Sequence, residues 1–138
     1  MRKSGGMTAE FWKHAAAVVV GGGLGSFLRF AAGAWVLHHH PAAKFPWATL
    51  GVNWVGCFLI GLICGWVENR TMLGTPLRYF LVTGLLGGFT TFSAFGMETI
   101  YLLKRGESGM AWLYVIASVA GGLLLAWVGE RVSAGILW

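Results

Sequence analysis

The residues best suited to do chemistry lie in one string inside an apolar segment, GGFTTFSAFGMET at residues 87–99. Its two adjacent glycines and its hydroxyl residues lower helix propensity, although the flanking sequence is strongly apolar. Backbone at membrane depth can leave a helix only where protein or water satisfies its freed N–H and C=O groups. Broken helices of this kind form ion sites, because carbonyls suit cations and N–H groups suit anions. We therefore predict a membrane helix broken near its midpoint, with the main chain near Thr90 released from the helix and the first half ending near Gly87.

The second half of this predicted broken helix carries an aromatic and polar face. Phe92, Phe95 and Thr99 follow one another at three- and four-residue spacing. Hydroxyl residues at its start can cap it, namely Thr90, Thr91 or Ser93. A pair of phenylalanines is more often packing than an ion lining, but a phenyl edge carries positive partial charge and can face an anion.

Composition indicates an integral membrane protein. Of the 138 residues, 57% are hydrophobic and 11% are charged, and the mean hydropathy is +0.69. About 20 residues cross the hydrocarbon as a helix, so four crossings use most of the chain. We predict an all-α membrane protein whose single transmembrane domain, residues 15–131, lies between tails at residues 1–14 and 132–138. Its four helices are predicted at about residues 15–37, 47–67, 77–103 and 110–128.

The charged residues lie mostly at the ends of the apolar segments. The formal net charge is +5, and Lys and Arg at segment ends hold helices in register with the headgroups rather than form a nucleic-acid surface. The N-terminal tail and the first apolar run together imitate a secretory signal peptide. Arg29 close behind that run, and the glycines at residues 21–25, favour a retained helix instead.

Two polar side chains fall inside the predicted crossings. Arg29 either attracts anions in an aqueous vestibule or extends its guanidinium to the headgroups. Asn53, the only amide within the apolar spans, shares a helix face with Thr49. Its side chain either makes an interhelical hydrogen bond or donates an N–H to a passing anion. The residues alone leave both pairs of alternatives open.

The remaining signals are weaker. On the fourth helix Tyr114, Ser118 and Gly122 recur at four-residue spacing, which fits either a hydrated lane or a helix contact. Cys57 and Cys64 share a helix face two turns apart and cannot form a disulfide with each other, so we interpret them as small apolar filler. The histidines at residues 38–40 precede a proline and are typical of a solvated turn.

Three strings of the sequence resemble the small bacterial fluoride channels of the Fluc/CrcB family. They are GSFLR at residues 25–29, TLGVN at residues 49–53 and, above all, GGFTTFSAFGMET at residues 87–99. The match covers nearly the whole chain after the tail. A single GxxxG pair has little specificity, whereas two glycines, two threonines and a Phe-Ser-x-Phe unit in the third of four helices form a specific signature.

The resemblance implies a fluoride-selective channel that lets fluoride leave the cytoplasm passively and protects against fluoride toxicity. It implies an antiparallel, dual-topology homodimer in the bacterial cytoplasmic (inner) membrane, with two fluoride pores and a structural sodium ion (Na+) at the dimer centre. The backbone carbonyls of Gly87 and Thr90 in each subunit would bind this sodium. The fluoride path would be formed by Asn53, Phe92 and Phe95 and extended by Thr49, Ser93, Glu98, Tyr114 and Ser118. We expect Arg29 in a vestibule near an entrance.

Two positions depart from the family pattern without touching the predicted sodium site. Ala94 stands where a threonine is common, and Gly122 stands where the fourth helix often has a serine. Each departure removes one hydroxyl group that the resemblance would otherwise place along the path.

Apart from Arg2, Lys3 and the predicted intramembrane Arg29, the basic residues divide almost evenly between the two predicted sides of the membrane. They are Lys13, Arg70, Arg78 and Arg131 against Lys44, Lys104 and Arg105. Orientation follows the bias of such residues, so this weak bias permits insertion both ways.

Rival functions remain open from the residues alone. A small four-helix multidrug or cation exporter is also a dual-topology dimer, but it needs a carboxylate embedded in its first helix, where this chain has Arg29. A non-transporting membrane assembly subunit would explain the glycines but leave the broken helix without a purpose. An enzyme is the poorest fit, because Ser93 has no histidine inside the spans to activate it and Glu98 has no second carboxylate.

Overall fold

The computed structural model describes residues 5–69 and 75–135, and its regular secondary structure over those residues is entirely helical. Four stretches are long and apolar enough to cross a membrane: Ala9–His39, Trp47–Trp66, Pro76–Lys104 and Ser108–Gly135. The protein is therefore a multi-pass membrane protein, and the prediction of four crossings is confirmed.

The helices are longer than predicted at both ends of the chain. α1 spans Gly5–His39 and α2 spans Trp47–Asn69. The third crossing consists of α3 (Thr75–Arg78), the π-helix η1 (Tyr79–Leu86), α4 (Gly87–Phe89) and α5 (Phe92–Lys104), and α6 spans Ser108–Gly135.

Local contacts explain both extensions. α1 begins inside the segment assigned to a tail, where Lys13 donates to Glu10 at 2.9 Å one turn away. α6 continues through Gly129, which was expected to end it. A Cβ at Gly129 would collide with the backbone of Phe58, so this glycine permits close packing of α6 on α2.

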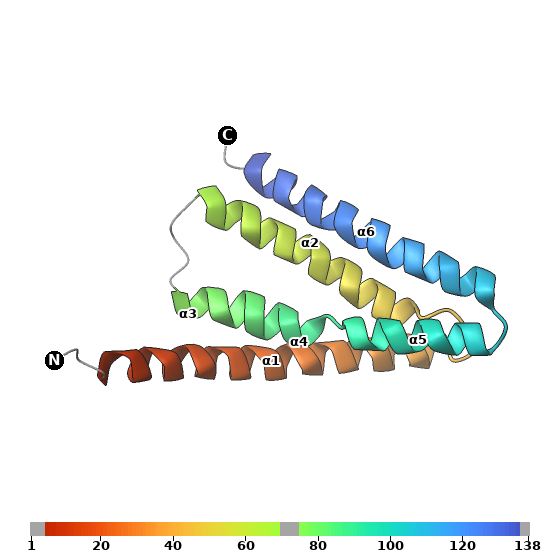
Figure 1. The fold of residues 1–138 in the computed structure, drawn as a ribbon, viewed down its shortest axis with the longest axis horizontal. Coiled ribbons are helices and arrows are strands. Elements are labelled where there is room, and N and C mark those ends of the chain that lie inside the picture. The colour runs from red at the N-terminus through yellow and green to blue at the C-terminus, as the bar shows by residue number, and fades with distance from the viewer. Residues whose placement is uncertain (1–4, 70–74, 136–138) are drawn as a thin grey trace.

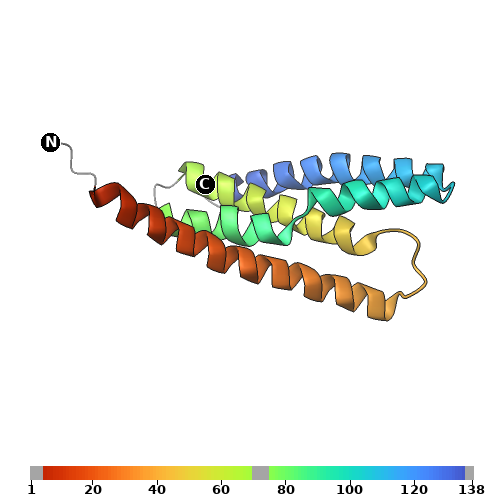
Figure 2. The ribbon, with the colours of Figure 1, turned by 60° about the horizontal axis from the view of Figure 1, so that its bottom comes forward.

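The third crossing changes its packing partner at its midpoint (Figure 1). Before the break, η1 and α4 pack along α1, and after it α5 packs on α6. Within the described part of the chain α5 makes no contact with α1, and Figure 2 shows the C-terminal half of α1 lying apart from α5. α2 packs along α6 and also touches both halves of the third crossing, so it is the element that can hold the break.

Glycines set the closest helix contacts. A Cβ at Gly21 or Gly25 of α1 would collide with backbone atoms of η1 and α4, so these glycines permit the two helices to pack closely. On α2, Gly61 faces the backbone of α6 and Gly56 faces the Thr90 side chain, whereas Gly51 faces open space. The glycines of α2 therefore permit close packing along most of its length.

The turn between α5 and α6 is a Schellman motif. Gly106 has φ +75°, and its N–H donates to Leu103 O at 3.0 Å while Glu107 N donates to Leu102 O at 3.0 Å. Beside this turn lies the main cluster of buried side chains, which contains Leu50, Leu102, Ala111 and Tyr114. At the same end of the bundle, where Lys44 of the connection to α2 pairs with Glu107 at 3.2 Å, α1 stops at His39 ahead of Pro41, so two of the three consecutive histidines are helical.

Candidate functional site

The third crossing leaves the helical conformation at Thr90 and Thr91. Thr90 has φ −83° and ψ 159°, and Thr91 has φ −152° and ψ 118°, so both are extended. The predicted interruption is confirmed, but the first half ends at Phe89 rather than near Gly87. Gly87 keeps helical angles, and Gly88 is where this crossing meets the backbone of α1. Gly88 therefore serves packing, and the break itself falls on the hydroxyl residues that follow.

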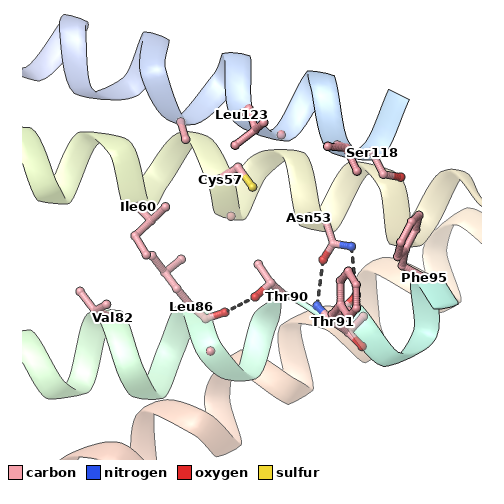
Figure 3. A pocket seen from close by; sticks show the side chains of 16 residues that line it. Asn53, Cys57, Ile60, Val82, Leu86, Thr90, Thr91, Phe95, Ser118 and Leu123 are labelled. Carbon is pink, nitrogen blue, oxygen red and sulfur yellow. Dashed lines mark hydrogen bonds between the residues drawn. The ribbon is translucent and has the colours of Figure 1, made fainter. Parts of the chain in front are cut away.

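Asn53 of α2 holds both polar backbone groups of Thr91. Its Nδ2 donates to Thr91 O at 3.0 Å, and its Oδ1 accepts from Thr91 N at 2.8 Å (Figure 3). The Thr91 hydroxyl in turn accepts from Ala94 N at 3.2 Å and caps α5, as one of the predicted capping residues. Two of the freed N–H groups at the break, those of Thr91 and Ala94, thus have partners from protein, as membrane depth requires.

These hydrogen bonds divert two amide donors away from the helical ladder. In a continuous α-helix Thr91 N would donate to Gly87 O, and Ala94 N would donate to Thr90 O. Here Asn53 takes the first donor and the Thr91 hydroxyl takes the second. Gly87 and Thr90 thus lose their helical donors, and theirs are the two carbonyls that the resemblance assigns to sodium. Carbonyl oxygens at the end of a half-helix carry partial negative charge, so this donor set fits a hard cation.

Arg29 approaches the break from α1. Its Nη1 donates to Thr90 O at 3.4 Å, and its side chain is half-buried. One turn earlier on α1, Ser26 Oγ donates to Gly88 O at 3.5 Å. The guanidinium therefore lies against the broken backbone itself, and its placement in an aqueous vestibule remains a prediction.

A cavity lies beside the break, between α2, the third crossing and α6. Its volume is about 490 Å³. Four of the predicted path residues line it, together with both predicted sodium ligands: Asn53, Phe92, Phe95, Ser118, Gly87 and Thr90. Figure 3 shows Asn53 and Thr91 at one end of the cavity and the apolar side chains of Ile60 and Val82 toward the other. Phe92 is 82% exposed, so this side of the cavity is open at the surface of the subunit.

Three further predicted residues form a separate cluster around a carboxylate. Thr49 Oγ1 donates to Glu98 Oε1 at 2.7 Å, and Tyr114 OH donates to Glu98 Oε2 at 2.7 Å. Tyr114 is fully buried and Thr49 is 9% exposed. Both hydroxyl hydrogens are therefore committed to Glu98, and an anion that used them would have to replace the carboxylate as acceptor.

Phe95 connects this carboxylate cluster to the cavity. Its ring centroid lies 5.4 Å from that of Phe92 and 5.2 Å from that of Tyr114. The Tyr114 ring is covered on another side by Phe45, at 5.5 Å and nearly perpendicular. An aromatic row thus runs from the open side of the cavity to the buried end of the bundle.

The remaining predicted path residue, Ser93, lies outside both groups. Ser93 is exposed and shares a hydrogen bond with the Thr91 hydroxyl at 3.2 Å. Gly122 lines the cavity opposite Cys57, and a Cβ there would lie 3.3 Å from Cys57 Sγ. A serine at this position would crowd the thiol, so the glycine and the cysteine fit each other. Among the described residues, no group of three or more His, Cys, Asp or Glu is placed to hold a metal ion.

Two contacts escaped the sequence interpretation. Trp54 Nε1 donates to Ala117 O at 2.9 Å and ties α2 to α6 next to the cavity. The sequence feature that marks this contact is Gly121, because a Cβ at this position would lie 2.6 Å from the Trp54 indole nitrogen. Phe45, from the connection between α1 and α2, had no periodic pattern that could place it over Tyr114.

Four crossings, an interrupted helix that presents backbone carbonyls, and a cavity beside the interruption define a class: small polytopic membrane proteins built for ion passage. The chain belongs to the CrcB family, because residues 16–130 match the family described as "CrcB-like protein, Camphor Resistance (CrcB)".

Curated relatives agree with this family. A protein of Thermus thermophilus is 48% identical over 120 residues, which cover 87% of this chain and 93% of the relative. One of Rhizobium leguminosarum is 48% identical over 115 residues (83% and 91%), and one of Methylobacillus flagellatus is 43% identical over 112 residues (81% and 88%). Each of the three is named "Fluoride-specific ion channel FluC".

Proposed function

We propose that this protein is a fluoride-selective channel through which fluoride leaves the cytoplasm passively. The observation that carries the proposal is the interrupted third crossing, held open by Asn53 and flanked by a cavity that Phe92 and Phe95 line. The names of the relatives indicate fluoride as the transported ion, and they describe channels rather than enzymes.

The side chains around the cavity are suited to a small anion. Fluoride is strongly hydrated, so a pore must replace its water with donors while remaining too narrow for larger halides. One Nδ2 hydrogen of Asn53 is bound to Thr91 O, which leaves the second for an anion. The edges of Phe92 and Phe95 and the buried hydroxyl of Ser118, which has no hydrogen-bond partner, supply further weak donors. Moderate donors of this kind bind the ion weakly enough to release it.

The working unit we propose is an antiparallel homodimer in the bacterial cytoplasmic membrane. The cavity is open beside the broken backbone of Gly87 and Thr90, and backbone of this kind cannot face lipid, which favours cover by a second copy. In such a dimer Gly87 O and Thr90 O of each subunit would together hold a sodium ion, which would supply a central positive charge between the subunits. The near balance of flanking basic residues is compatible with this arrangement.

The buried carboxylate cluster would form the inner part of the path. Phe95 touches Tyr114, so a fluoride ion that passes Phe95 reaches the two hydroxyls held by Glu98. At this point the ion and the carboxylate compete for the same hydrogens, which favours passage over tight binding.

A multidrug or cation exporter is the less well supported alternative. The ionisable group of α1 at the broken backbone is Arg29, and the carboxylate of α1, Glu10, is exposed and paired with Lys13. A cationic drug would meet a guanidinium instead of a carboxylate.

Growth assays in a bacterial strain that lacks its own fluoride exporter separate these alternatives. We expect the wild-type chain to restore growth on fluoride but not on a quaternary ammonium compound, and Phe95→Ile to fail on fluoride at equal membrane expression. Resistance to the ammonium compound without resistance to fluoride would reject the channel and favour the exporter.

A further inference from the structure

The Arg29 side chain is half-buried, and among the described residues no carboxylate forms an ion pair with its charge. Among the described ion pairs, Glu10 binds Lys13 and Glu107 binds Lys44, and Glu98 accepts from two hydroxyls. The hydrogen-bond acceptor of the Arg29 guanidinium is instead the Thr90 carbonyl at the break, at 3.4 Å. A cation at the C-terminal end of a helix is stabilised by the helix dipole, so the end of α4 provides the compensating negative charge.

Close backbone packing makes this contact possible. A Cβ at Gly25 would lie 2.8 Å from Phe89 N, and one at Gly88 would collide with Gly22, so α1 and α4 meet without intervening side chains. At this short separation Ser26 reaches Gly88 O and Arg29, one turn further along α1, reaches Thr90 O. The two residues thus follow the exposed carbonyls of the first half-helix toward the break.

The Thr90 oxygen is also one of the two that would bind sodium. We propose that the Arg29 guanidinium and sodium compete for the Thr90 carbonyl, so that the arginine holds this oxygen in the subunit without sodium and weakens sodium binding in the dimer. This inference rests on the proposed function, because it assumes the sodium site between two subunits. It adds a regulation of that site by a residue outside the sodium ligand set.

Electrostatics gives the direction and rough size of the effect. Two unit positive charges that share one oxygen repel each other, and a half-buried site screens this repulsion only partly. Replacement of Arg29 by a neutral side chain of similar length should therefore lower the sodium concentration needed for half-maximal stabilisation by about tenfold or more. The same replacement removes a donor from Thr90 O, so the protein without sodium should become less stable.

The test measures unfolding rather than transport. The purified full-length protein is heated in detergent over a graded sodium series, with N-methylglucamine as the replacement cation, and the midpoint is followed by circular dichroism. For Arg29→Met we expect a lower midpoint without sodium and saturation at about tenfold less sodium or below. Arg29→Lys keeps the charge and should saturate close to wild type.

Arg131→Met is the matched control. It removes the same charge from α6, where Arg131 is exposed and lies over the Trp127 ring at 5.6 Å, away from the break. It should leave the sodium dependence unchanged. An equal shift in this variant would mean that net charge alone weakens sodium binding, and it would overturn the proposal.

The outcomes separate this inference from the sodium site itself. If no variant, wild type included, responds to sodium, then both the sodium site and the competition are rejected. If wild type responds and Arg29→Met needs the same or more sodium, then the arginine supports the carbonyl instead of competing for it, and the inference fails while the proposed function stands. A failure of Arg29→Met to form a folded dimer at any sodium concentration would also reject the competition, because it would make the arginine a requirement for the site.

Discussion

Loss of the Asn53 side chain should allow the third crossing to become continuous. In Asn53→Ala, Thr91 N has no side-chain acceptor and can return to Gly87 O, which is its partner in an unbroken helix. Thr91 O loses the Asn53 donor at the same time and keeps the helical one that an N-cap carbonyl has. We therefore expect a protein that still inserts and folds, but whose Gly87 carbonyl is no longer available to a cation.

The structure sets the size of this effect. The two side-chain hydrogen bonds of Asn53 together contribute about 1–3 kcal/mol, and the Thr91 N–H recovers part of this loss when it returns to the helical ladder. We expect Asn53→Ala to lower the free energy of unfolding by about 2 kcal/mol. Trp54→Phe is the matched control, because it removes one interhelical hydrogen bond from the next residue of α2 without touching the break. It should cost about 1 kcal/mol or less.

Two measurements on the same preparations decide the matter. Unfolding of the purified proteins in a graded denaturant gives the stability difference, and fluoride efflux from liposomes gives transport. We expect Asn53→Ala to lose nearly all efflux and Trp54→Phe to keep it. If Asn53→Ala transports fluoride like wild type at the reduced stability, then the amide does not maintain the break and the reasoning about diverted donors is wrong.

Four other predictions follow from the same geometry. Replacement of Phe92 or Phe95 by Ile removes an aromatic edge from the cavity and should strongly reduce fluoride efflux while the dimer persists in size-exclusion chromatography; unchanged efflux would exclude these rings from the path. Glu98→Gln replaces an acceptor oxygen by a donor facing Thr49 or Tyr114, so unfolding should become easier by about 1–2 kcal/mol in denaturant titrations, and unchanged stability would contradict the hydrogen-bonded cluster. Arg29→Ala should lower the efflux rate and keep the preference for fluoride over chloride in parallel electrode recordings, and a lost preference would place the guanidinium in the selective part of the path. Gly61→Leu should prevent close packing of α2 on α6, with little folded protein in the membrane fraction by fluorescence-detected chromatography, whereas Gly51→Leu, which faces open space, should fold.

Much of the fold could be predicted because the signals in this sequence are local. Apolar runs of bilayer length fix four crossings, and the small residues of α1 and α2 mark the close contacts. The existence of the break followed from propensity at residues 87–93. Its position near Thr90 followed as well, although the first half keeps its helix through Gly88, which packs against α1. The partner of Thr91 did not follow, because Asn53 is 38 residues away in the sequence.

In the candidate site, too, one part could be predicted from the sequence and another could not. The side-chain types around the cavity were recognisable from the strings at residues 49–53 and 87–99. The pairing of Glu98 with Thr49 and Tyr114 was not, since it depends on how α2, α5 and α6 rotate against one another. Asn53 carried two possible roles in the sequence, and the structure confirms the interhelical hydrogen bond. Its second Nδ2 hydrogen keeps the role toward an anion as a prediction.

The most direct test of the central claim is the efflux of fluoride from liposomes that contain the purified wild-type protein, followed with an ion-selective electrode and compared with chloride under the same gradient. The arrangement around Asn53, Phe92 and Phe95 leads us to expect rapid fluoride efflux and chloride efflux no faster than from empty liposomes. Fluoride efflux no faster than from empty liposomes, in a preparation shown to contain folded protein, would contradict the account.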